Sequence, residues 1–337
     1  MRRIGDNARP PARLQRRNAG MNTLHDPQKA HAATLDRLRL IAAFAVVYLV
    51  WSSTYLFIRI GVTEIPPALL AGLRFVIAGG VLAGLGLARG GALPRGRDWI
   101  TMGVLALGLV VGGNGVVTWA EQWVPSGETA FIVSSSALFT AGFGTLGRRG
   151  EKLTAVTLAG LALGFTGTAL MLLPRLHGQH GPLLPALALV GSACGWSASA
   201  MYARSAGVKT APLVFSGLEM ILGGVILLGI AGGTGDFGSV RWGAKGLAAL
   251  AYLTVFGSAV TYTTYNWLIH HTSPAQLGTV SYVNPAIALF LGWAVLGEVL
   301  PPTAFAGVGV MLAGVVLVNL RRRLPRRGPL VKPGTGA

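Results

Sequence analysis

The chain has 337 residues, of which 52% are hydrophobic and only 12% are charged. A soluble domain of this length does not need so apolar a composition, so the balance predicts membrane spans rather than one large core. The formal net charge of +17 does not indicate a nucleic-acid-binding protein, because Lys and Arg gather at the two ends and in short connectors, with no basic stripe. The single cysteine, Cys194, excludes an internal disulfide framework.

The first 38 residues are basic and contain no apolar segment. A secretory signal would place a short hydrophobic region directly after its charges, and here nothing apolar follows until the first full-length span. We therefore expect residues 1–38 to form a cytoplasmic arm that fixes topology and touches anionic lipid. Met21 is an alternative start that would shorten this arm, and whether the arm is ordered stays open.

Ten apolar stretches follow between Leu38 and Leu320. Each has the roughly 20 residues that a helix needs to cross about 30 Å of hydrocarbon. Prolines fall at the ends or starts of these runs, where helices tolerate them. The limits are 39–61, 67–88, 98–120, 127–147, 154–173, 183–205, 211–232, 243–269, 274–297 and 302–320. The sequence therefore predicts an all-α polytopic membrane protein with ten transmembrane helices and no extramembrane domain.

Part of the first apolar stretch recurs about halfway along the chain. Trp51-Ser52 and Arg59 recur as Trp196-Ser197 and Arg204, each 145 residues later. Five helices per half is an odd number, so the second half must enter the membrane in the opposite orientation to the first. This predicts two inverted five-helix repeats, a plan shared by many secondary transporters that bind substrate near the midplane.

The repeats are expected to span residues 39–173 and 183–320, and a basic tail over residues 321–337 completes the chain. Lys and Arg favour the cytoplasmic side of a membrane. With the N-terminus inside, that side receives most of the 28 basic residues. The outside receives Arg175, Arg241 and Lys245. We therefore expect a multi-pass protein of the cell (inner) membrane with both termini in the cytoplasm.

Several motifs resemble the EamA-type branch of the drug/metabolite transporter superfamily. One runs from Ser273-Pro274-Ala275 through Tyr282-Val283-Asn284-Pro285 to Leu296-Gly297-Glu298 and looks like the fourth-helix pattern of the second EamA repeat. Trp51-Ser52 with Arg59, and Gly72-Leu73-Arg74-Phe75, are similar to the opening of the first repeat. The resemblance covers about residues 40–320. It implies efflux of a small organic metabolite, such as an amino acid or related compound, by alternating access.

The first repeat departs from the family pattern in its fourth helix. Ser135 or Ser136 stands where the family commonly has a Pro, and Gly147-Arg148 stands where it has Gly-Glu. We therefore expect this helix to be straighter than its partner in the second repeat, so that the two gates are not strictly symmetric.

Polar side chains inside spans are expensive and tend to face a bundle interior or water. An in-plane pseudo-twofold axis would place the two Trp-Ser steps on opposite sides of one cavity. The predicted substrate pathway comprises Trp51, Ser52, Tyr55, Asn114, Thr118, Ser136, Trp196, Ser197, Tyr262, Tyr265, Tyr282 and Asn284. The alternative is that the hydroxyls bond their own backbone or join helices, and that the aromatic rings pack or anchor at the interface.

Three charged residues are candidates for gating or charge pairing: Arg59, Arg74 and Glu219. Arg59 lies at the outer end of its span, against the positive-inside trend. Arg74 is expected a third of the way in from the outside, and Glu219, its repeat counterpart, a third in from the cytoplasm. The alternative is that neighbours neutralise Arg74 and Glu219 and fix packing only, the candidates being Glu64, Glu128 and Arg204.

No cofactor and no metal are expected. Residues 142–147 fit GxGxxG but lie in an apolar helix without a preceding strand, and the histidine pairs lack a third ligand. The expected partners are a small-molecule substrate and the lipid bilayer; a homodimer stays open. Proton coupling, through Glu219 or Glu121, is also open. The alternatives are a membrane scaffold or sensor, which normally needs a soluble output domain, and an intramembrane enzyme, although the spans contain no His.

Overall fold

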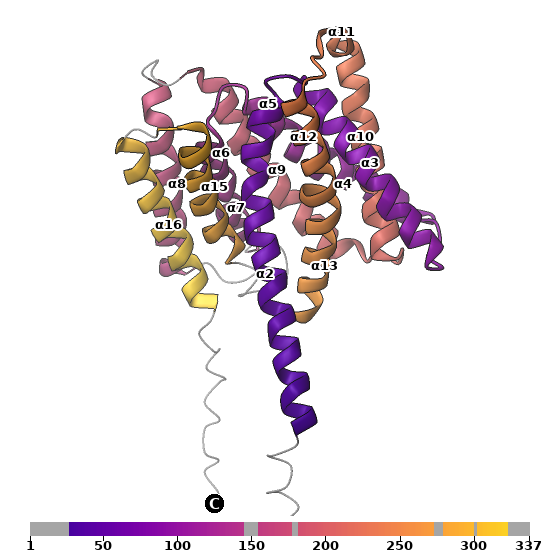
Figure 1. The fold of residues 1–337 in the computed structure, drawn as a ribbon. Coiled ribbons are helices and arrows are strands. Elements are labelled where there is room, and N and C mark those ends of the chain that lie inside the picture. The colour runs from indigo at the N-terminus through magenta and orange to yellow at the C-terminus, as the bar shows by residue number, and fades with distance from the viewer. Residues whose placement is uncertain (1–26, 145–153, 177–180, 273–278, 300–301, 323–337) are drawn as a thin grey trace, which may run out of the picture. The chain divides into compact units, whose positions relative to one another are not determined.

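The computed structural model describes residues 27–144, 154–176, 181–272, 279–299 and 302–322, and all regular structure in these ranges is helical. The chain divides into two compact units, residues 1–45 and 46–337. The helices are α2 (Pro27–Gly61), α3 (Pro67–Ala88), α4 (Arg97–Leu105), η1 (Ala106–Gly115), α5 (Val116–Ala120), α6 (Ser126–Ser134), α7 (Ser136–Phe143), α8 (Ala155–Leu176), α9 (Leu183–Ala206), α10 (Pro212–Gly233), α11 (Asp236–Ser239), α12 (Ala244–Tyr252), η2 (Leu253–Val260), α13 (Thr261–His271), α15 (Val280–Leu296) and α16 (Pro302–Arg322). Figure 1 labels most of them.

Within the described residues, seven helices are long and apolar enough to cross a membrane. They are Asp36–Gly61, Pro67–Ala88, Arg97–Ala120, Ala155–Leu176, Leu183–Ala206, Pro212–Gly233 and Ala244–Tyr265. Two shorter apolar helices, Val283–Leu296 and Phe305–Leu317, and the pair α6 and α7 occupy the remaining predicted stretches. The prediction of an all-helical membrane protein with about ten helices is confirmed. The fourth and ninth fall short of a full span partly because the fourth is broken and residues 273–278 lie outside the described ranges.

The fourth helix is expected to be straighter than its partner in the second repeat, but it is interrupted, whereas α15 is continuous over Val280–Leu296. It breaks at Ser135, whose N–H bonds to the carbonyl of Ile132 at 3.1 Å and whose carbonyl accepts from the N–H of Leu138 at 2.9 Å. These are three-residue bonds, and the carbonyl of Ser135 also keeps a four-residue bond of the α-helical type, from the N–H of Phe139 at 3.2 Å. The hydroxyl of Ser134 also bonds to the carbonyl of Phe131 at 2.7 Å. The hydroxyl of Ser135 itself has no hydrogen-bond partner in the described ranges, so Ser134 is the serine here that competes for a backbone carbonyl.

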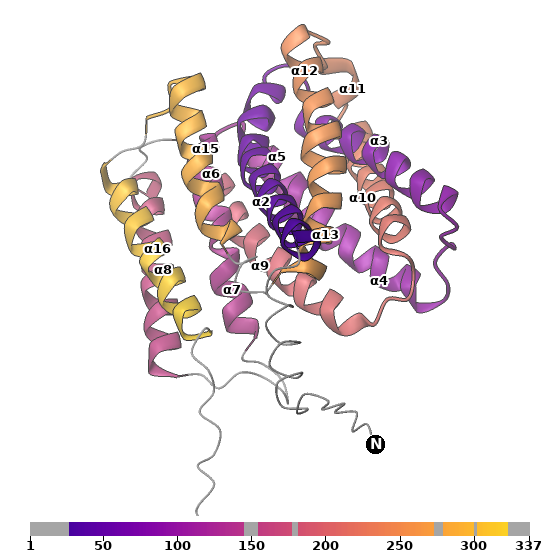
Figure 2. The same cartoon turned by 60° about the horizontal axis from the view of Figure 1, so that its bottom comes forward.

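A pseudo-twofold relation between the repeats is visible where α3 packs against α10 (Figures 1 and 2). A methyl group added at Gly79 would lie 2.5 Å from the carbonyl oxygen of Gly217, and one added at Gly224 would lie 2.9 Å from that of Gly72. Gly72 and Gly217 are 145 residues apart, and so are Gly79 and Gly224. The two contacts are therefore images of each other, made by antiparallel helices at backbone contact distance.

Helices α8 and α16 repeat this arrangement. A methyl group added at Gly167 would lie 2.6 Å from the carbonyl oxygen of Gly307, and one added at Gly314 would lie 2.5 Å from that of Gly160. Here the matching residues are 147 positions apart. Since both helix pairs are antiparallel, the repeats have opposite orientation. The prediction of inverted repeats is confirmed.

The glycine contacts also show how far two buried charged residues, Arg74 and Glu219, lie from the level of the pseudo-twofold axis. The twofold level crosses α3 between residues 75 and 76, midway between the levels of Gly72 and Gly79. Arg74 lies one to two residues from it, about 2 Å at 1.5 Å per residue, and Glu219 lies equally close to it in α10. Both residues thus lie close to the twofold level, and their depth in the membrane stays a prediction.

The third helix of each repeat contains a stretch of wider π-helical turns, η1 in one and η2 in the other. In η1 the side-chain amide of Asn114 donates to the carbonyl of Leu109, five residues back, at 3.1 Å. In the second repeat the hydroxyl of Thr261 bonds to the carbonyl of Phe256, also five residues back, at 2.7 Å. Such turns change the direction in which the side chains after them point.

The connectors gather at two opposite ends of the unit formed by residues 46–337. One end, which we call the Arg59 end, carries the loops 62–66, 121–125, 234–243 and 297–299; the N–H of Arg241 there bonds to the carbonyl of Glu64 at 2.8 Å. The other, the Asp98 end, carries the loops 89–96 and 207–211. Asp98 accepts hydrogen bonds there from the backbone of Lys209 and Thr210 and from the Thr210 hydroxyl, at 3.3, 3.0 and 2.6 Å.

Candidate substrate pathway

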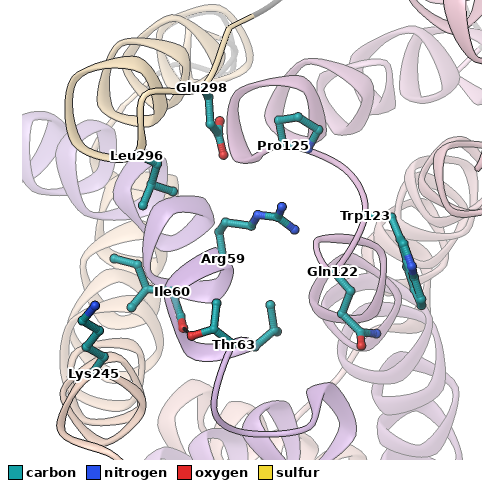
Figure 3. Close-up of a pocket in the computed structure, with 10 residues that line it drawn as sticks. Arg59, Ile60, Thr63, Gln122, Trp123, Pro125, Lys245, Leu296 and Glu298 are labelled. Atoms are coloured by element: carbon teal, nitrogen blue, oxygen red, sulfur yellow. Dashed lines mark hydrogen bonds between the residues drawn. The ribbon is translucent and has the colours of Figure 1, made fainter. Parts of the chain in front are cut away.

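A pocket of about 630 Å³ opens at the Arg59 end of the helices (Figure 3). Its size falls in the range of small-molecule binding sites. We call it the Arg59 pocket, because the Arg59 side chain projects into its centre between Glu298, Pro125 and Gln122. The lining residues are Arg59, Ile60, Val62, Thr63, Gln122, Trp123, Pro125, Lys245, Leu296 and Glu298.

Arg59 is held at this position by the backbone of the third helix. Its Nη1 donates to the carbonyl oxygen of Glu121, which directly precedes the pocket residue Gln122. The carboxylate of Glu121 is fully buried, and neither of its oxygens has a hydrogen-bond partner among the residues that the structure describes. Four neighbours interact electrostatically with this carboxylate: the carboxylate Glu298, the two cations Arg59 and Arg74, and Tyr55.

Arg74 is the second buried charge beneath the pocket, with 3% of its surface exposed. Its Nη2 donates to Oδ1 of Asn114 at 2.8 Å, and its guanidinium carbon lies 4.3 Å from the centre of the Phe75 ring. Within the described ranges, its Nε and Nη1 have no partner. The hydroxyl of Thr118 bonds to the carbonyl of Asn114 at 2.8 Å, so it braces the backbone below this amide.

The neighbours considered as neutralising partners of Arg74 are engaged elsewhere. Glu128 forms a buried two-pronged ion pair with Arg175, with N–O distances of 2.8 and 2.9 Å. Glu64 accepts the N–H of Gly246, at the start of α12, at 2.5 Å. Among the described residues, no carboxylate lies within 4.0 Å of the Arg74 guanidinium.

Glu219, the repeat counterpart of Arg74, is also 3% exposed. Its Oε1 has no hydrogen-bond partner in the described part of the chain, and Arg204 does not form an ion pair with it there. Ser216 precedes Glu219 by one turn of α10. Tyr262 lies beside Ser216 and interacts electrostatically with Glu219. Arg204 instead interacts electrostatically with Tyr265.

The two Trp-Ser steps pack against different partners. The Trp51 ring lies 5.0 Å from the Tyr265 ring, and the Ser52 hydroxyl bonds to the carbonyl of Tyr48 in its own helix. Trp196 packs on Gly113 of η1, where an added methyl group would lie 2.7 Å from the indole. The glycine run of the third helix is therefore a site of close packing. A cavity lined by both tryptophans stays a prediction.

Ser197 joins the broken fourth helix to α9. Its hydroxyl lies 2.8 Å from the carbonyl of Ser136 and 2.9 Å from that of Ala193. This is the helix-joining role that was the alternative for hydroxyls. In the ninth helix, Oδ1 of Asn284 is buried without a partner in the described ranges. The side chain of Tyr282 lies outside what the structure describes.

Sequence reasoning did not place Gln122, Lys245 or Glu298 at a site, yet all three line the Arg59 pocket. A sequence pattern could have marked Glu298, because this residue closes the Gly-Glu motif of the second repeat. Another could have marked Glu121, since it shares a helix face with Asn114 and Thr118. Neither pattern predicts a pocket, because the pocket walls come from segments far apart in the sequence.

The chain was compared with known proteins. The model of the EamA-like transporter family matches residues 38–173 and 183–320. A protein of Escherichia coli (strain K12) described as "Uncharacterized inner membrane transporter YedA" is 35% identical over 297 residues, covering 88% of this chain and 95% of its own. The "Probable terminal-alkyne amino-acid exporter" of Streptantibioticus cattleyicolor is 25% identical over 299 residues, covering 88% of this chain and 98% of its own.

A solved structure described as "Crystal structure of protein" has the same fold, with a TM-score of 0.60. It is 22% identical and covers 85% of this chain and 99% of its own. The family so matched is one of transporters, not of enzymes.

Proposed function

The chain belongs to the EamA-like transporter family, and on this premise we propose that it exports a small organic metabolite, an amino acid or related compound, by alternating access. The observation that carries the proposal is the pair of inverted repeats with buried charges near their twofold level that form no ion pair in the described ranges. Arg74 lies on one side of this level and Glu219 on the other, and both are buried. Buried charges of this kind mark substrate or ion pathways in membrane proteins.

Outward direction and substrate class are supported by a relative rather than by geometry. The similar protein of Streptantibioticus cattleyicolor is described as an amino-acid exporter. The similar protein of Escherichia coli is described as an inner-membrane transporter, which supports the same membrane for this chain. We propose that both termini lie in the cytoplasm, since the Asp98 end carries Arg89, Arg95, Arg97, Arg204 and Lys209 whereas the Arg59 end carries fewer cations.

Coupling is proposed to depend on Glu219. A buried carboxyl near the midplane, beside a tyrosine and without an ion pair in the described ranges, can bind and release a proton as each side opens. A facilitator or exchanger is the competing mechanism. A homodimer stays open, since a single chain is described.

Flux into proteoliposomes tests the function, using a panel of amino acids and drugs with and without a pH gradient. We expect uptake of at least one amino acid, at a rate that the pH gradient changes. Arg74→Ala and Glu219→Gln variants that reach the membrane at wild-type levels should be at least about tenfold slower, and Arg95→Gln, which removes an exposed charge, should be unchanged. Wild-type rates in both buried-site variants would refute their role. No flux of any compound under any gradient would favour a non-transporting scaffold.

A further inference from the structure

Beneath the Arg59 pocket, the chain holds two opposite charges that do not meet. Nε and Nη1 of Arg74 and both carboxylate oxygens of Glu121 lack hydrogen-bond partners in the described part of the chain. Glu121 interacts electrostatically with Glu298, with Arg59 and, more weakly, with Arg74. Burying charges without partners is costly, and a direct ion pair would be the simplest remedy. Its absence within 4.0 Å leaves free donors on one side and free acceptors on the other.

The third helix sets the spacing between these groups. Asn114, Thr118 and Glu121 share one face at positions i, i+4 and i+7. Arg74 is tied to Asn114, and Glu121 lies seven residues further on, about 10 Å along the helix axis. Side chains in a helix lean toward its N-terminus, so the Glu121 carboxylate leans back toward Thr118 and Arg74. Arg74 and Glu121 nevertheless form no ion pair within 4.0 Å in the described ranges.

We propose that the unpartnered atoms of Arg74 and Glu121 together bind a zwitterion, a molecule that carries a carboxylate and an ammonium group on one carbon. The carboxylate accepts from the free N–H groups of Arg74, and the ammonium donates to the oxygens of Glu121. Both charge-assisted contacts replace partners that the protein does not supply. The inference rests on the proposed function, which it deepens by naming the two residues that recognise the substrate.

A ligand with only one charge fits this site poorly. A simple carboxylic acid would satisfy Arg74 and leave Glu121 buried without a partner, and a simple amine would do the reverse. Sites built to bond a polar group reject analogues that lack it, because a buried partner is then left unpaired. Each of the two residues is therefore responsible for one half of the selectivity.

Arg59 links Glu121 to the Arg59 pocket. It donates to the backbone carbonyl of Glu121, and its side chain projects into the pocket. It therefore offers a substrate carboxylate a second guanidinium at the edge of this pocket.

Ligand binding to the purified full chain in detergent tests the site. The probes are alanine, leucine and phenylalanine, each with its deaminated acid and its decarboxylated amine: propionate and ethylamine, 4-methylpentanoate and 3-methylbutylamine, 3-phenylpropionate and 2-phenylethylamine. We expect at least one amino acid to bind about tenfold or more tightly than both of its analogues, the effect of one charge-assisted hydrogen bond.

The variants should then divide the selectivity. Glu121→Gln should abolish the preference for the amino acid over the acid and keep the preference over the amine, whereas Arg74→Gln should do the opposite. Where either variant is unstable, Glu121→Asp and Arg74→Lys keep the charge and should show the same crossed pattern in weaker form. Arg95→Gln and Asp36→Asn, which remove exposed charges, are the controls that should bind like wild type.

Two results would overturn the site: no amino acid preferred over both analogues by the wild type, or wild-type selectivity in both variants. Flux measured with the same preparations separates this failure from failure of the function. Selective binding without flux would keep the site and end the transport proposal. Flux without selectivity for zwitterions would keep transport and end the site.

Discussion

Glu298 accepts two hydrogen bonds from Ser126, one from its backbone N–H at 2.8 Å and one from its hydroxyl at 2.9 Å. A third comes from the N–H of Gly127 at 3.1 Å. These residues begin α6, whose N-terminal N–H groups would otherwise lack acceptors, since Pro125 offers no side-chain cap. A carboxylate of the second repeat thus caps a helix of the first repeat, at the rim of the Arg59 pocket, and favours it electrostatically.

Replacing this carboxylate should destabilise the fold. We expect Glu298→Ala to lower the free energy of unfolding by about 2 kcal/mol or more, because three donors lose a charged acceptor. Glu298→Gln should cost less, since its amide oxygen still accepts. Gly292→Ala should resemble the alanine variant, because its new methyl group would lie 2.4 Å from Oε2 of Glu298. Denaturation in detergent measures each variant, and wild-type stability in Glu298→Ala and Gly292→Ala would refute the capping role.

The Arg175–Glu128 ion pair should show strong coupling between its partners. Their side chains are 1% and 6% exposed, so removing one leaves the other charge buried and alone. We expect Arg175→Gln to cost about 3–5 kcal/mol of unfolding free energy, and the double variant Arg175→Leu/Glu128→Leu to cost less than the sum of the single changes. A double-mutant cycle in detergent gives the coupling energy. Additive single changes would contradict a direct pair.

The contact between α3 and α10 can be tested with two adjacent glycines. Gly79→Ala would push a methyl group against the backbone of α10, 2.5 Å from the Gly217 oxygen, whereas Gly80→Ala meets nothing within 4 Å. We expect the first change to cost about 1–3 kcal/mol, as overpacking does, and the second to be neutral or stabilising, since alanine favours a helix. Equal stability of the two variants, compared by thermal unfolding, would show that the helices are not packed at this contact.

Thiol labelling tests the orientation of the chain. In a Cys194→Ser background, Thr63→Cys places an exposed thiol at the Arg59 pocket, and Ser205→Cys places one at the end of α9 on the opposite side. With both termini in the cytoplasm, a membrane-impermeant maleimide added to intact cells should label the first thiol and not the second. Inverted vesicles should give the opposite pattern. Labelling of Ser205→Cys in intact cells would reverse the proposed topology.

Much of the fold depends on local features of the sequence and could be predicted from them. The length of each apolar stretch decides whether it can cross the membrane, and the recurrence of Trp51-Ser52 at Trp196-Ser197 marks the repeat without any knowledge of contacts. The break at Ser135 was not predicted, because the missing proline was taken as the sign of a straighter helix, whereas the hydroxyl of Ser134 also competes for a backbone carbonyl. The role of Glu298 was missed because its partner lies 172 residues earlier.

Apolar length and the odd number of helices per repeat were enough to predict a ten-helix membrane protein with inverted halves, because both follow from residue counts alone. Side-chain partners were not predictable in this way. Arg74 had Glu64 and Glu128 as candidates in the sequence, and the structure ties it to Asn114 instead, since the wide turns of η1 re-aim that amide and Arg175 already holds Glu128. Which charges pair depends on how distant helices pack, and only the tertiary structure decided that Arg74 and Glu121 form no ion pair with each other in the described ranges.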